Sequence, residues 1–245
     1  KKLKKNKINI KIFLMKEFAK KFYQSYFLQF SKLLPFIDAK LAVSKDYFTI
    51  HKKKKWITNI NSRRVGNFLR SKYDCIVSTA KTINYDNSLL NCRIEGLEKK
   101  SPAVVIIDRT FKIKTNLEIF RDKSRKFIII TQNSESLKEK YFKKIGVNVI
   151  KLKKLNFSIN KKYNIFLYLK KLGFNRILIE CGVKFTNEIL KNNLIKNFYL
   201  FKSPIKLKNN GKNNSNSSLI RNFKLTYKNK VKINLNGDSL YRVQL

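Results

Sequence analysis

Short runs of uninterrupted apolar residues constrain the fold of this chain more than any other feature of its sequence. Residues 103–107 (AVVII) and 127–131 (FIIIT) lack the polar alternation of a strand with one wet face. Such runs are typical of parallel strands that are covered on both faces. Segments with the helical spacing of apolar residues separate them. The alternation predicts an α/β fold, with a central, mostly parallel sheet and helices on both faces.

The predicted elements run along most of the chain. We expect strands at residues 7–13, 36–43, 74–78, 103–107, 127–131, 147–150 and 176–180. We expect helices at residues 15–34, 59–70, 134–144, 161–172 and 182–193. The Gly/Asn/Ser-rich run 209–218 is typical of a mobile loop, and residues 223–245 are expected to add short antiparallel strands at a sheet edge.

The second helix carries the clearest capping signal. Thr58 or Asn59 can accept a hydrogen bond from the first helical amides. Val65, Phe68 and Leu69 would then face the core. The first helix has the clearest stop, because Pro35 cannot continue it.

The net charge of +41 would ordinarily indicate a polyanion-binding protein. The lysines are instead spread along the whole chain among many Asn and Ile, which is typical of an A+T-rich coding bias on solvated faces. The aromatic residues fall mostly on the apolar faces of predicted elements. Because clustering of cations is the footprint of a nucleic-acid site, we expect no nucleic-acid partner. A basic nucleic-acid-binding protein stays as an alternative, and it predicts steeply salt-sensitive binding.

Cysteine and histidine usage excludes several kinds of site. Cys75, Cys92 and Cys181 are odd in number and far apart, so neither a disulfide framework nor a zinc site is indicated. A reduced, cytoplasmic location fits best. His51 is the only histidine, which excludes a multi-His metal site, and we expect no metal. No apolar run approaches the roughly 20 residues that cross a bilayer, so no membrane association is expected.

Two polar features lie where the predicted strand 176–180 ends. Ligands of open α/β sheets bind at the carboxyl ends of strands, and Glu180 is the last residue of this one. Its carboxylate can accept hydrogen bonds from a ligand, or can simply pair with a lysine. Gly182 then begins a helix whose free amides can attract phosphate, although an ordinary strand-to-helix turn has the same pattern.

Cations and scarce acids recur between residues 70 and 93. Arg70 and Arg93 can each bind a phosphate through a planar fork of donors, although most arginines in so basic a chain are simply solvated. Thr82, Asp86 and Leu90 recur every four residues, which suits one helix face or a tight loop. Asp86 stands out because the chain has only 15 acidic residues.

An ordered set of short motifs links these residues. The set comprises Pro35-Phe36, Lys40-Leu-Ala42, Ser44-x-Asp46, Trp56-Ile-Thr58, Arg63-Arg64, Arg70, Asp74, Ile76-Val77, Thr82-x3-Asp86, Leu90-x2-Arg93, Val105-Ile-Ile-Asp108 and Ile179-Glu180-x-Gly182. With it, the chain resembles the reductase domain of bacterial bifunctional riboflavin-biosynthesis proteins, which has a dihydrofolate-reductase-like fold. The resemblance extends over residues 36–245 and is strongest before Asp108.

The resemblance implies an NADPH-dependent reductase acting on a phosphoribosylaminopyrimidine, 5-amino-6-(5-phosphoribosylamino)uracil, whose ribosyl group becomes ribityl. It implies cofactor contacts at Ala42, Trp56, Thr82, Asp86, Gly182, Val183, Lys184, Phe185 and Thr186. It implies substrate contacts at Lys40, Lys54, Arg70, Leu90, Arg93 and Glu180. Arg70 and Arg93 would face the phosphate, and Lys40 and Glu180 the pyrimidine. Lys40, Asp86 and Glu180 are the catalytic candidates, although the hydride itself comes from the cofactor.

The chain departs from the family pattern in four places. Tyr47 replaces a usual glycine, Lys54 a small polar residue, Asn87-Ser88 an Asp-Pro pair, and Val183 a glycine or proline. The family protein starts with a zinc deaminase domain, whose His-x-Glu and Pro-Cys-x-x-Cys motifs do not occur in this sequence. We expect residues 1–34 to be the tail of that domain with a connecting helix, residues 35–245 to be the reductase domain, and two copies to form a homodimer.

Two further alternatives remain open at this point. Another reductase of the same fold could act on a pterin-like substrate, which would not need two phosphate-type arginines. A degenerate, inactive remnant would explain the altered turn positions.

Overall fold

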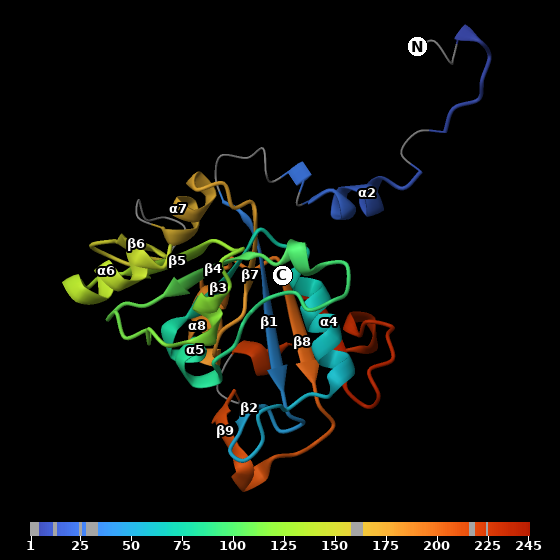
Figure 1. Cartoon of the computed structure of the whole chain (residues 1–245). Helices are drawn as coiled ribbons and strands as arrows, with labels where there is room; N and C mark the ends of the chain where they lie inside the picture. The colour runs from blue at the N-terminus through green and yellow to red at the C-terminus, as the bar shows by residue number, and fades with distance from the viewer. Residues whose placement is uncertain are drawn as a thin grey trace.

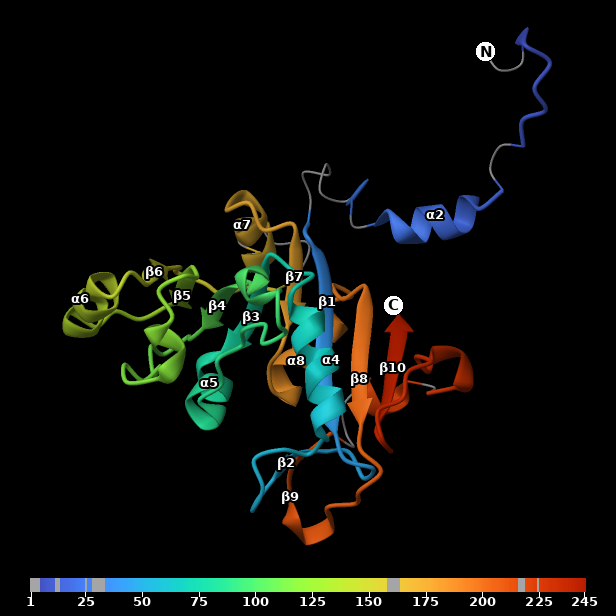
Figure 2. The same cartoon turned by 45° about the vertical axis from the view of Figure 1, so that its right-hand side comes forward.

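The computed structural model describes residues 5–11, 14–24, 26–27, 34–157, 164–215, 219–223 and 225–245. Near the N-terminus, α2 (Lys16–Phe22) lies apart from the rest of the fold (Figures 1 and 2). Residues 7–11 form no strand, so that prediction is wrong, and residues 12–13 lie outside the described residues. The remainder of the predicted helix 15–34 lies partly outside them as well.

One eight-stranded sheet forms the centre of the molecule (Figure 1), in the order β10-β8-β1-β7-β3-β4-β5-β6. All its strands are parallel except β10, which pairs antiparallel with β8 at the edge. The strands are β1 Phe36–Val43, β3 Cys75–Thr79, β4 Ala103–Ile107, β5 Phe127–Thr131, β6 Asn148–Lys151, β7 Arg176–Ile179, β8 Asn197–Lys202 and β10 Ser239–Gln244. The predicted mostly parallel sheet is confirmed, while β8 was not expected.

Helices cover both faces of this sheet, as predicted. Residues of α4 (Ile60–Arg70), α5 (Ala80–Asp86) and α6 (Ser136–Lys144) enter one core layer, and residues of α7 (Ile165–Lys171) and α8 (Val183–Lys191) enter the other. Successive residues of the central strands alternate between the two layers, which is why both kinds of position in these strands are apolar.

Helix α4 confirms one expectation and corrects another. Its N-cap is Asn59, whose side-chain oxygen accepts from the amide of Ser62 at 3.1 Å. Phe68, however, is 45% exposed and does not face the core. The buried positions of α4 are small or polar apart from one leucine, because the helix lies over the polar site described below; they are Ser62, Gly66, Asn67 and Leu69.

A second, two-stranded sheet was missed by the sequence analysis. It pairs β2 (Phe48–His51) with β9 (Gly211–Asn214), so part of the predicted loop 209–218 is a strand. Residues 216–218 lie outside the described residues. The ring of Phe48 lies directly against Gly211, which leaves no room there for a Cβ atom.

Short 3-10 turns lie between the strands and helices, and the last of them, η5, falls where further strands were expected after residue 223. They are η1 Glu98–Lys100, η2 Glu118–Arg121, η3 Lys208–Asn210, η4 Leu219–Asn222 and η5 Tyr227–Asn229. In the described part of 223–245, β10 is the strand that joins the main sheet.

The winding of the sheet reverses around β1. Helix α4 connects β1 to β3 over one face, while α8 connects β7 to β8 over the other. Ligands of open α/β sheets bind at such a switch point, outside the carboxyl ends of the strands. The fold therefore directs attention to the ends of β1, β7 and β3. Among the helices in the described residues, none has the length and apolarity needed to span a membrane.

Candidate functional site

A buried ion pair joins α4 to the end of β7. The guanidinium of Arg70, the last residue of α4, donates from Nε to Oε1 of Glu180 at 2.7 Å and from Nη2 to Oε2 at 3.0 Å. The Nη1 atom of Arg70 donates to Oδ1 of Asn67 and to the carbonyl of Asn91, both at 3.0 Å. The side chains of Arg70 and Glu180 are only 13% and 8% exposed. A bidentate pair of this kind fixes the orientation of the carboxylate.

Lys40 completes the cluster from the neighbouring strand. The register pairs Ala39 of β1 with Ile179 of β7, which brings Lys40 beside Glu180, one residue further on each strand. The Nζ atom of Lys40 lies 3.9 Å from Oε2 of Glu180. All three residues were predicted from the sequence as site residues, and we call them the Lys40–Arg70–Glu180 cluster.

Burial and charge compete within the cluster. Burial alone would raise the pKa of Glu180, but the charges of Arg70 and Lys40 hold it below its usual value. Burial would lower the pKa of Arg70, but the Glu180 carboxylate raises it instead. Burial lowers the pKa of Lys40, and this effect prevails over the opposing charge of Glu180. The cluster therefore holds an ionised carboxylate and an ammonium group that loses its proton more easily than an ordinary lysine.

Asp86 ends α5 near the same cluster. Its side chain is exposed, but enough protein surrounds it for the loss of hydration to raise its pKa, against the charges of Lys40 and Lys55. The negative charge of Asp86 acts in turn on Lys40. The structure thus brings the three catalytic candidates within electrostatic reach of one another.

Thr82 ties α5 to the turn that follows Glu180. Its Oγ1 atom accepts from the amide of Gly182 at 3.2 Å and lies 2.9 Å from Oγ1 of Thr79. Gly182 is the N-cap residue of α8 and has no side chain with which to cap the helix. The spacing from Thr82 to Asp86 is therefore helical, which settles the choice between helix and loop that the sequence left open.

The first turn of α8 is turned mostly toward the protein interior. Thr186 is fully buried, and its hydroxyl lies 3.4 Å from Sγ of Cys181. Phe185 packs edge-to-face on Phe157, and Val183 packs against the core. Of the four residues 183–186, Lys184 is the exposed one. A ligand at this turn would therefore meet mainly backbone amides.

A group of cationic and aromatic side chains lies beside the cluster. Trp56 is 49% exposed. The ammonium of Lys55 lies 5.3 Å from the centre of its ring, and the guanidinium of Arg63 lies 5.1 Å from it. Arg93 is exposed; partial burial lowers its pKa, and the charges of Arg70 and Arg63 lower it further. These arginines therefore repel one another in a protein without a bound anion.

The remaining predicted residues are placed less centrally. Ala42 lies in β1 two residues beyond Lys40, on the same face of the sheet. Lys54 is exposed, and its amide donates to Nδ1 of His51 at 3.2 Å. Leu90 is buried, with a left-handed φ of 49°.

Two partners of Arg70 were not predicted from the sequence. Asn67 precedes Arg70 by three residues on a predicted helix, so the helical spacing could have placed their side chains together. Asn91 contributes its backbone carbonyl, and a backbone contact across 21 residues leaves no signal in the sequence.

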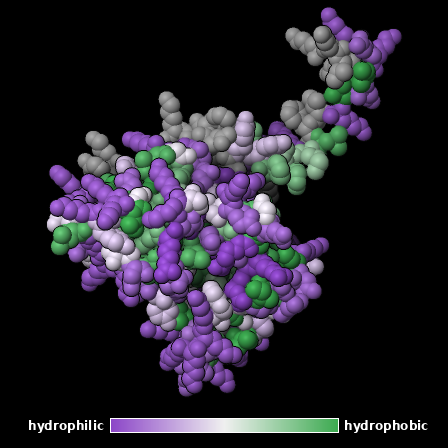
Figure 3. Space-filling model, viewed as in Figure 1, coloured by the Kyte–Doolittle hydropathy of each residue, from purple (hydrophilic) through white to green (hydrophobic). Residues whose placement is uncertain are grey.

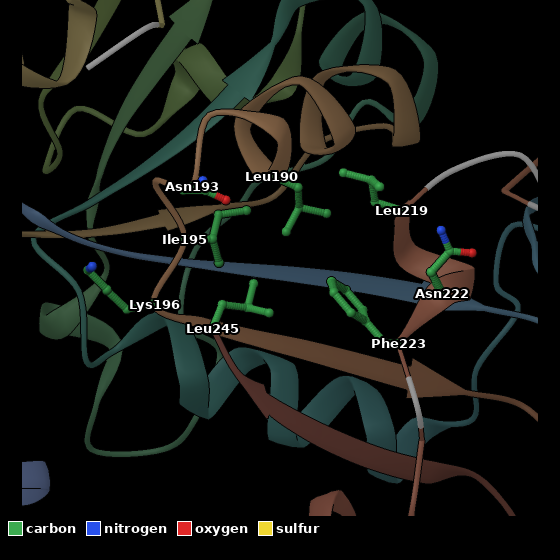
Figure 4. Close-up of a pocket in the computed structure, with 8 residues that line it drawn as sticks. All are labelled: Leu190, Asn193, Ile195, Lys196, Leu219, Asn222, Phe223 and Leu245. Atoms are coloured by element: carbon green, nitrogen blue, oxygen red, sulfur yellow. The ribbon is translucent and has the colours of Figure 1, made fainter. Parts of the chain in front are cut away.

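A mostly apolar cavity lies elsewhere. It measures about 410 Å³ and lies between α8, η4 and the C-terminus on the opposite face of the sheet (Figure 4). Its lining is mostly apolar and includes Leu190, Ile195, Phe223 and Leu245. A second hollow, of about 680 Å³, lies near Lys112 and Tyr141. The candidate residues line neither, so the site is defined by its charges and hydrogen bonds.

Relatives of the chain carry names related to riboflavin. A protein from Buchnera aphidicola subsp. Baizongia pistaciae named riboflavin biosynthesis protein RibD is 30% identical over 243 residues, which cover 91% of this chain and 64% of that protein. A Buchnera aphidicola subsp. Acyrthosiphon pisum protein named 5-amino-6-(5-phosphoribosylamino)uracil reductase is 29% identical over 61% of this chain and 75% of its own length. This chain spans 64% and 56% of the first two curated relatives, so it corresponds to a part of them.

Solved structures agree on the fold. Acinetobacter baumannii RibD matches with a TM-score of 0.74 at 19% identity, over 99% of this chain and 67% of that one. The Saccharomyces cerevisiae riboflavin biosynthesis reductase Rib7 matches with a TM-score of 0.67 at 19% identity, over 93% and 99%. The family model described as the RibD C-terminal domain matches residues 35–233, which contain every member of the cluster. The chain therefore belongs to the RibD C-terminal domain family.

Proposed function

We propose that this chain is a reductase that uses NADPH to reduce the ribosyl group of 5-amino-6-(5-phosphoribosylamino)uracil to a ribityl group. The observation that carries the proposal is the buried Lys40–Arg70–Glu180 cluster at the switch point of the sheet. The chain belongs to a family that includes a relative named for this reaction. The start of the family match at residue 35 supports placing the reductase domain at residues 35–245, with residues 1–34 as a connecting segment.

The cluster suits the pyrimidine end of this substrate. Glu180 is held ionised and oriented by Arg70, so it can accept hydrogen bonds from ring N–H or amino groups. All but one of the N–H donors of Arg70 are already used within the protein. Arg70 therefore serves mainly to orient Glu180. The expectation from the sequence, that its guanidinium binds a phosphate, is replaced by this role.

The phosphate end of the substrate suits Arg93. Arg93 is exposed, and its pKa is lowered by partial burial and then by the charges of Arg70 and Arg63. A phosphate dianion beside Arg93 would relieve the repulsion among these three cations. Lys54, exposed in the segment before Trp56, is a further cation for the same end of the substrate.

The turn at Gly182 fits a dinucleotide. The backbone φ of Gly182 is −68°, which any residue adopts, and a Cβ atom there would meet Thr82 Oγ1 only at 3.9 Å. Neither conformation nor internal packing requires glycine, so close approach of a ligand to the backbone is a reason for it. The amides at the start of α8 suit a pyrophosphate. Thr82, Asp86, Ala42 and Trp56 then border the cofactor.

The reaction requires a hydride and a proton. NADPH, when bound, supplies the hydride to the sugar carbon. The proton goes to the neighbouring nitrogen or oxygen, and Lys40 is suited to provide it, because burial lowers its pKa and makes its ammonium a stronger acid. The charges of Glu180 and Asp86 oppose this shift, because each raises the pKa of Lys40.

The family match favours the reductase over the polyanion-binding alternative. Hydrophilic side chains cover most of the face shown in Figure 3, and apolar ones lie between them in small groups, without one continuous stripe. Arg93, the exposed arginine at the phosphate end, also favours a phosphorylated substrate over a pterin. The three buried, free cysteines are consistent with a reduced, cytoplasmic location. Pairing of two copies stays a prediction.

Turnover with defined substrates tests the proposal. The protein is incubated with NADPH or NADH and with 5-amino-6-(5-phosphoribosylamino)uracil, and the product is identified by mass spectrometry. We expect NADPH to be consumed only when protein and substrate are both present, with a product that has gained one hydride and one proton. Oxidation with a dihydropterin instead would favour the pterin reductase. Absence of both oxidation and NADPH binding would contradict the proposal.

A further inference from the structure

A second arginine is buried behind the site. The side chain of Arg125, which precedes β5, is only 3% exposed. Its Nε donates to Oδ2 of Asp122 at 2.6 Å, and its Nη2 donates to the carbonyl of Leu89 at 2.7 Å. Its Nη1 donates to the carbonyl of Leu90 at 3.1 Å and reaches that of Pro102 at 3.5 Å. A buried guanidinium is costly unless its donors are satisfied, and here backbone carbonyls satisfy most of them.

The segment that Arg125 holds has a strained residue at its centre. Leu90 has a φ of 49°, which is the left-handed region that a bulky residue rarely adopts. Strain of this kind costs of order 1–3 kcal/mol and persists only where neighbouring contacts impose it. The carbonyl of Leu90 faces Arg125, whereas the next carbonyl, that of Asn91, faces Arg70 at 3.0 Å. The turn at Leu90 thus directs successive carbonyls to two different guanidinium groups.

We infer that Arg125 is a positioning residue for the Lys40–Arg70–Glu180 cluster. By holding the carbonyls of Leu89 and Leu90, Arg125 fixes the place of the Asn91 carbonyl. That carbonyl accepts a hydrogen bond from Nη1 of Arg70, and Nε and Nη2 of Arg70 then donate to Glu180. Arg125 contacts no ligand and acts through this chain of hydrogen bonds. The inference rests on the proposed function only for its kinetic consequence.

The same segment continues to the phosphate end of the site. The amide of Cys92 donates to Oγ of Ser101 at 3.0 Å, and Arg93 follows directly. Arg125 reaches the neighbouring Pro102 carbonyl, so it connects both sides of this contact. Loosening Arg125 should therefore disturb the substrate side of the site and leave the turn at Gly182 unaffected.

Kinetics of Arg125 variants test the inference. Arg125→Met should raise KM for 5-amino-6-(5-phosphoribosylamino)uracil about tenfold and leave KM for NADPH within about twofold. Arg125→Lys should restore part of the loss, because an ammonium can still donate to one or two of the carbonyls. The control, Arg121→Met, removes an exposed arginine nearby and should change neither value. An equal rise in both KM values would overturn the inference.

A double-mutant cycle separates positioning from general stabilisation. In an Arg70→Lys background, Arg125→Met should cause little further rise in substrate KM, because the contact through which it acts is already changed. Additive effects would overturn the inference. If Arg125→Met does not fold, Asp122→Asn replaces it, because this change frees Nε of Arg125 and keeps its charge. It should raise substrate KM in the same direction by a smaller factor, and an unchanged KM would count against the inference.

Amide hydrogen exchange distinguishes failure of this inference from failure of the proposed function. In Arg125→Met, the Cys92 amide should exchange faster, while amides of β3 and β7 stay as protected as in the wild type. If the wild type fails to oxidise NADPH with the substrate, the proposed function fails and this exchange pattern alone decides the inference. Unchanged exchange at Cys92 would overturn it.

Discussion

The Lys40–Arg70–Glu180 cluster and the pair formed by Arg109 and Glu188 contain similar charges in very different surroundings. Arg70 and Glu180 are 13% and 8% exposed and meet at 2.7 Å, whereas Arg109 and Glu188 are 52% and 45% exposed and meet at 3.5 Å. Shifts in pKa accompany the buried cluster, driven by burial and by the charges of its members. In a chain with 56 Lys and Arg residues, functional charge is therefore distinguished by burial and partners, and the number of cations is uninformative.

The largest expected effect comes from removing the shared carboxylate. Glu180→Gln leaves Arg70 and Lys40 buried without their counter-charge, which should cost about 3–5 kcal/mol of unfolding free energy and abolish turnover. Glu188→Gln removes an exposed partner and should cost no more than about 1 kcal/mol. Urea unfolding of both variants measures the difference. Similar losses would break the comparison between the two pairs.

A charge-conserving change at Arg70 should have the next largest effect. Arg70→Lys keeps the positive charge and removes the bidentate contact with Glu180, so substrate kcat/KM should fall by about ten- to a hundredfold. Arg109→Lys is the matched change in the exposed pair and should leave kcat/KM within about twofold. Steady-state kinetics with varied substrate measure both. An unaffected Arg70→Lys enzyme would show that orientation of Glu180 is unimportant.

The pH profile should report Lys40. Its folded-state pKa is lowered by burial below the ordinary lysine value of 10.5, so the ammonium form is lost as the pH rises through that lowered pKa. Turnover should therefore decline on the alkaline side at a pH below 10.5. Lys40→Gln should have low, nearly flat turnover across the same range. A wild-type decline that persists in Lys40→Gln would assign the titration to another group.

At acidic pH, the unfolding free energy should depend on the protonation of Glu180. The pKa of Glu180 is held down in the folded state by Arg70 and Lys40, in spite of burial. Its contribution is therefore complete above the ordinary glutamate pKa and is lost as the pH falls through the folded-state pKa. Unfolding free energy of the wild type should decrease over that acidic range more than that of Glu180→Gln. Parallel pH curves for the two proteins would contradict the assigned shift.

The smallest expected effect concerns the exposed cations. Arg93→Gln should raise substrate KM about three- to tenfold without loss of stability, because Arg93 is exposed and repelled by its neighbours. Added salt should raise the wild-type KM and have less effect on the variant. Kinetics at two salt concentrations measure this. A salt dependence that is unchanged in Arg93→Gln would remove Arg93 from the phosphate end.

The central strands β4 and β5 were predictable because each carries a continuous apolar run. They occur where the sequence places them, since strands covered on both faces need no polar alternation. β2 and β9 were missed because each is short and their paired residues are 160 or more positions apart in the sequence, which leaves no local pattern. Helical spacing predicted that Phe68 faces the core. In the structure, the buried face of α4 includes Gly66 and Asn67 instead, next to the cluster.

The site was partly predictable for a similar reason. Glu180 and Arg70 stand at the ends of elements that their sequence defines, so their meeting follows from the topology. The contact of Arg70 with the Asn91 carbonyl, and the support of that segment by Arg125, depend on side-chain directions and backbone carbonyls. Such contacts are set by tertiary packing and have no fixed sequence spacing.

NADPH oxidation with 5-amino-6-(5-phosphoribosylamino)uracil, measured side by side for the wild type, Glu180→Gln and Glu188→Gln, tests the central claim most directly. A reductase whose substrate is held by the Lys40–Arg70–Glu180 cluster predicts substrate-dependent oxidation by the wild type and Glu188→Gln, and none by Glu180→Gln. Oxidation by folded Glu180→Gln at the wild-type rate would contradict it.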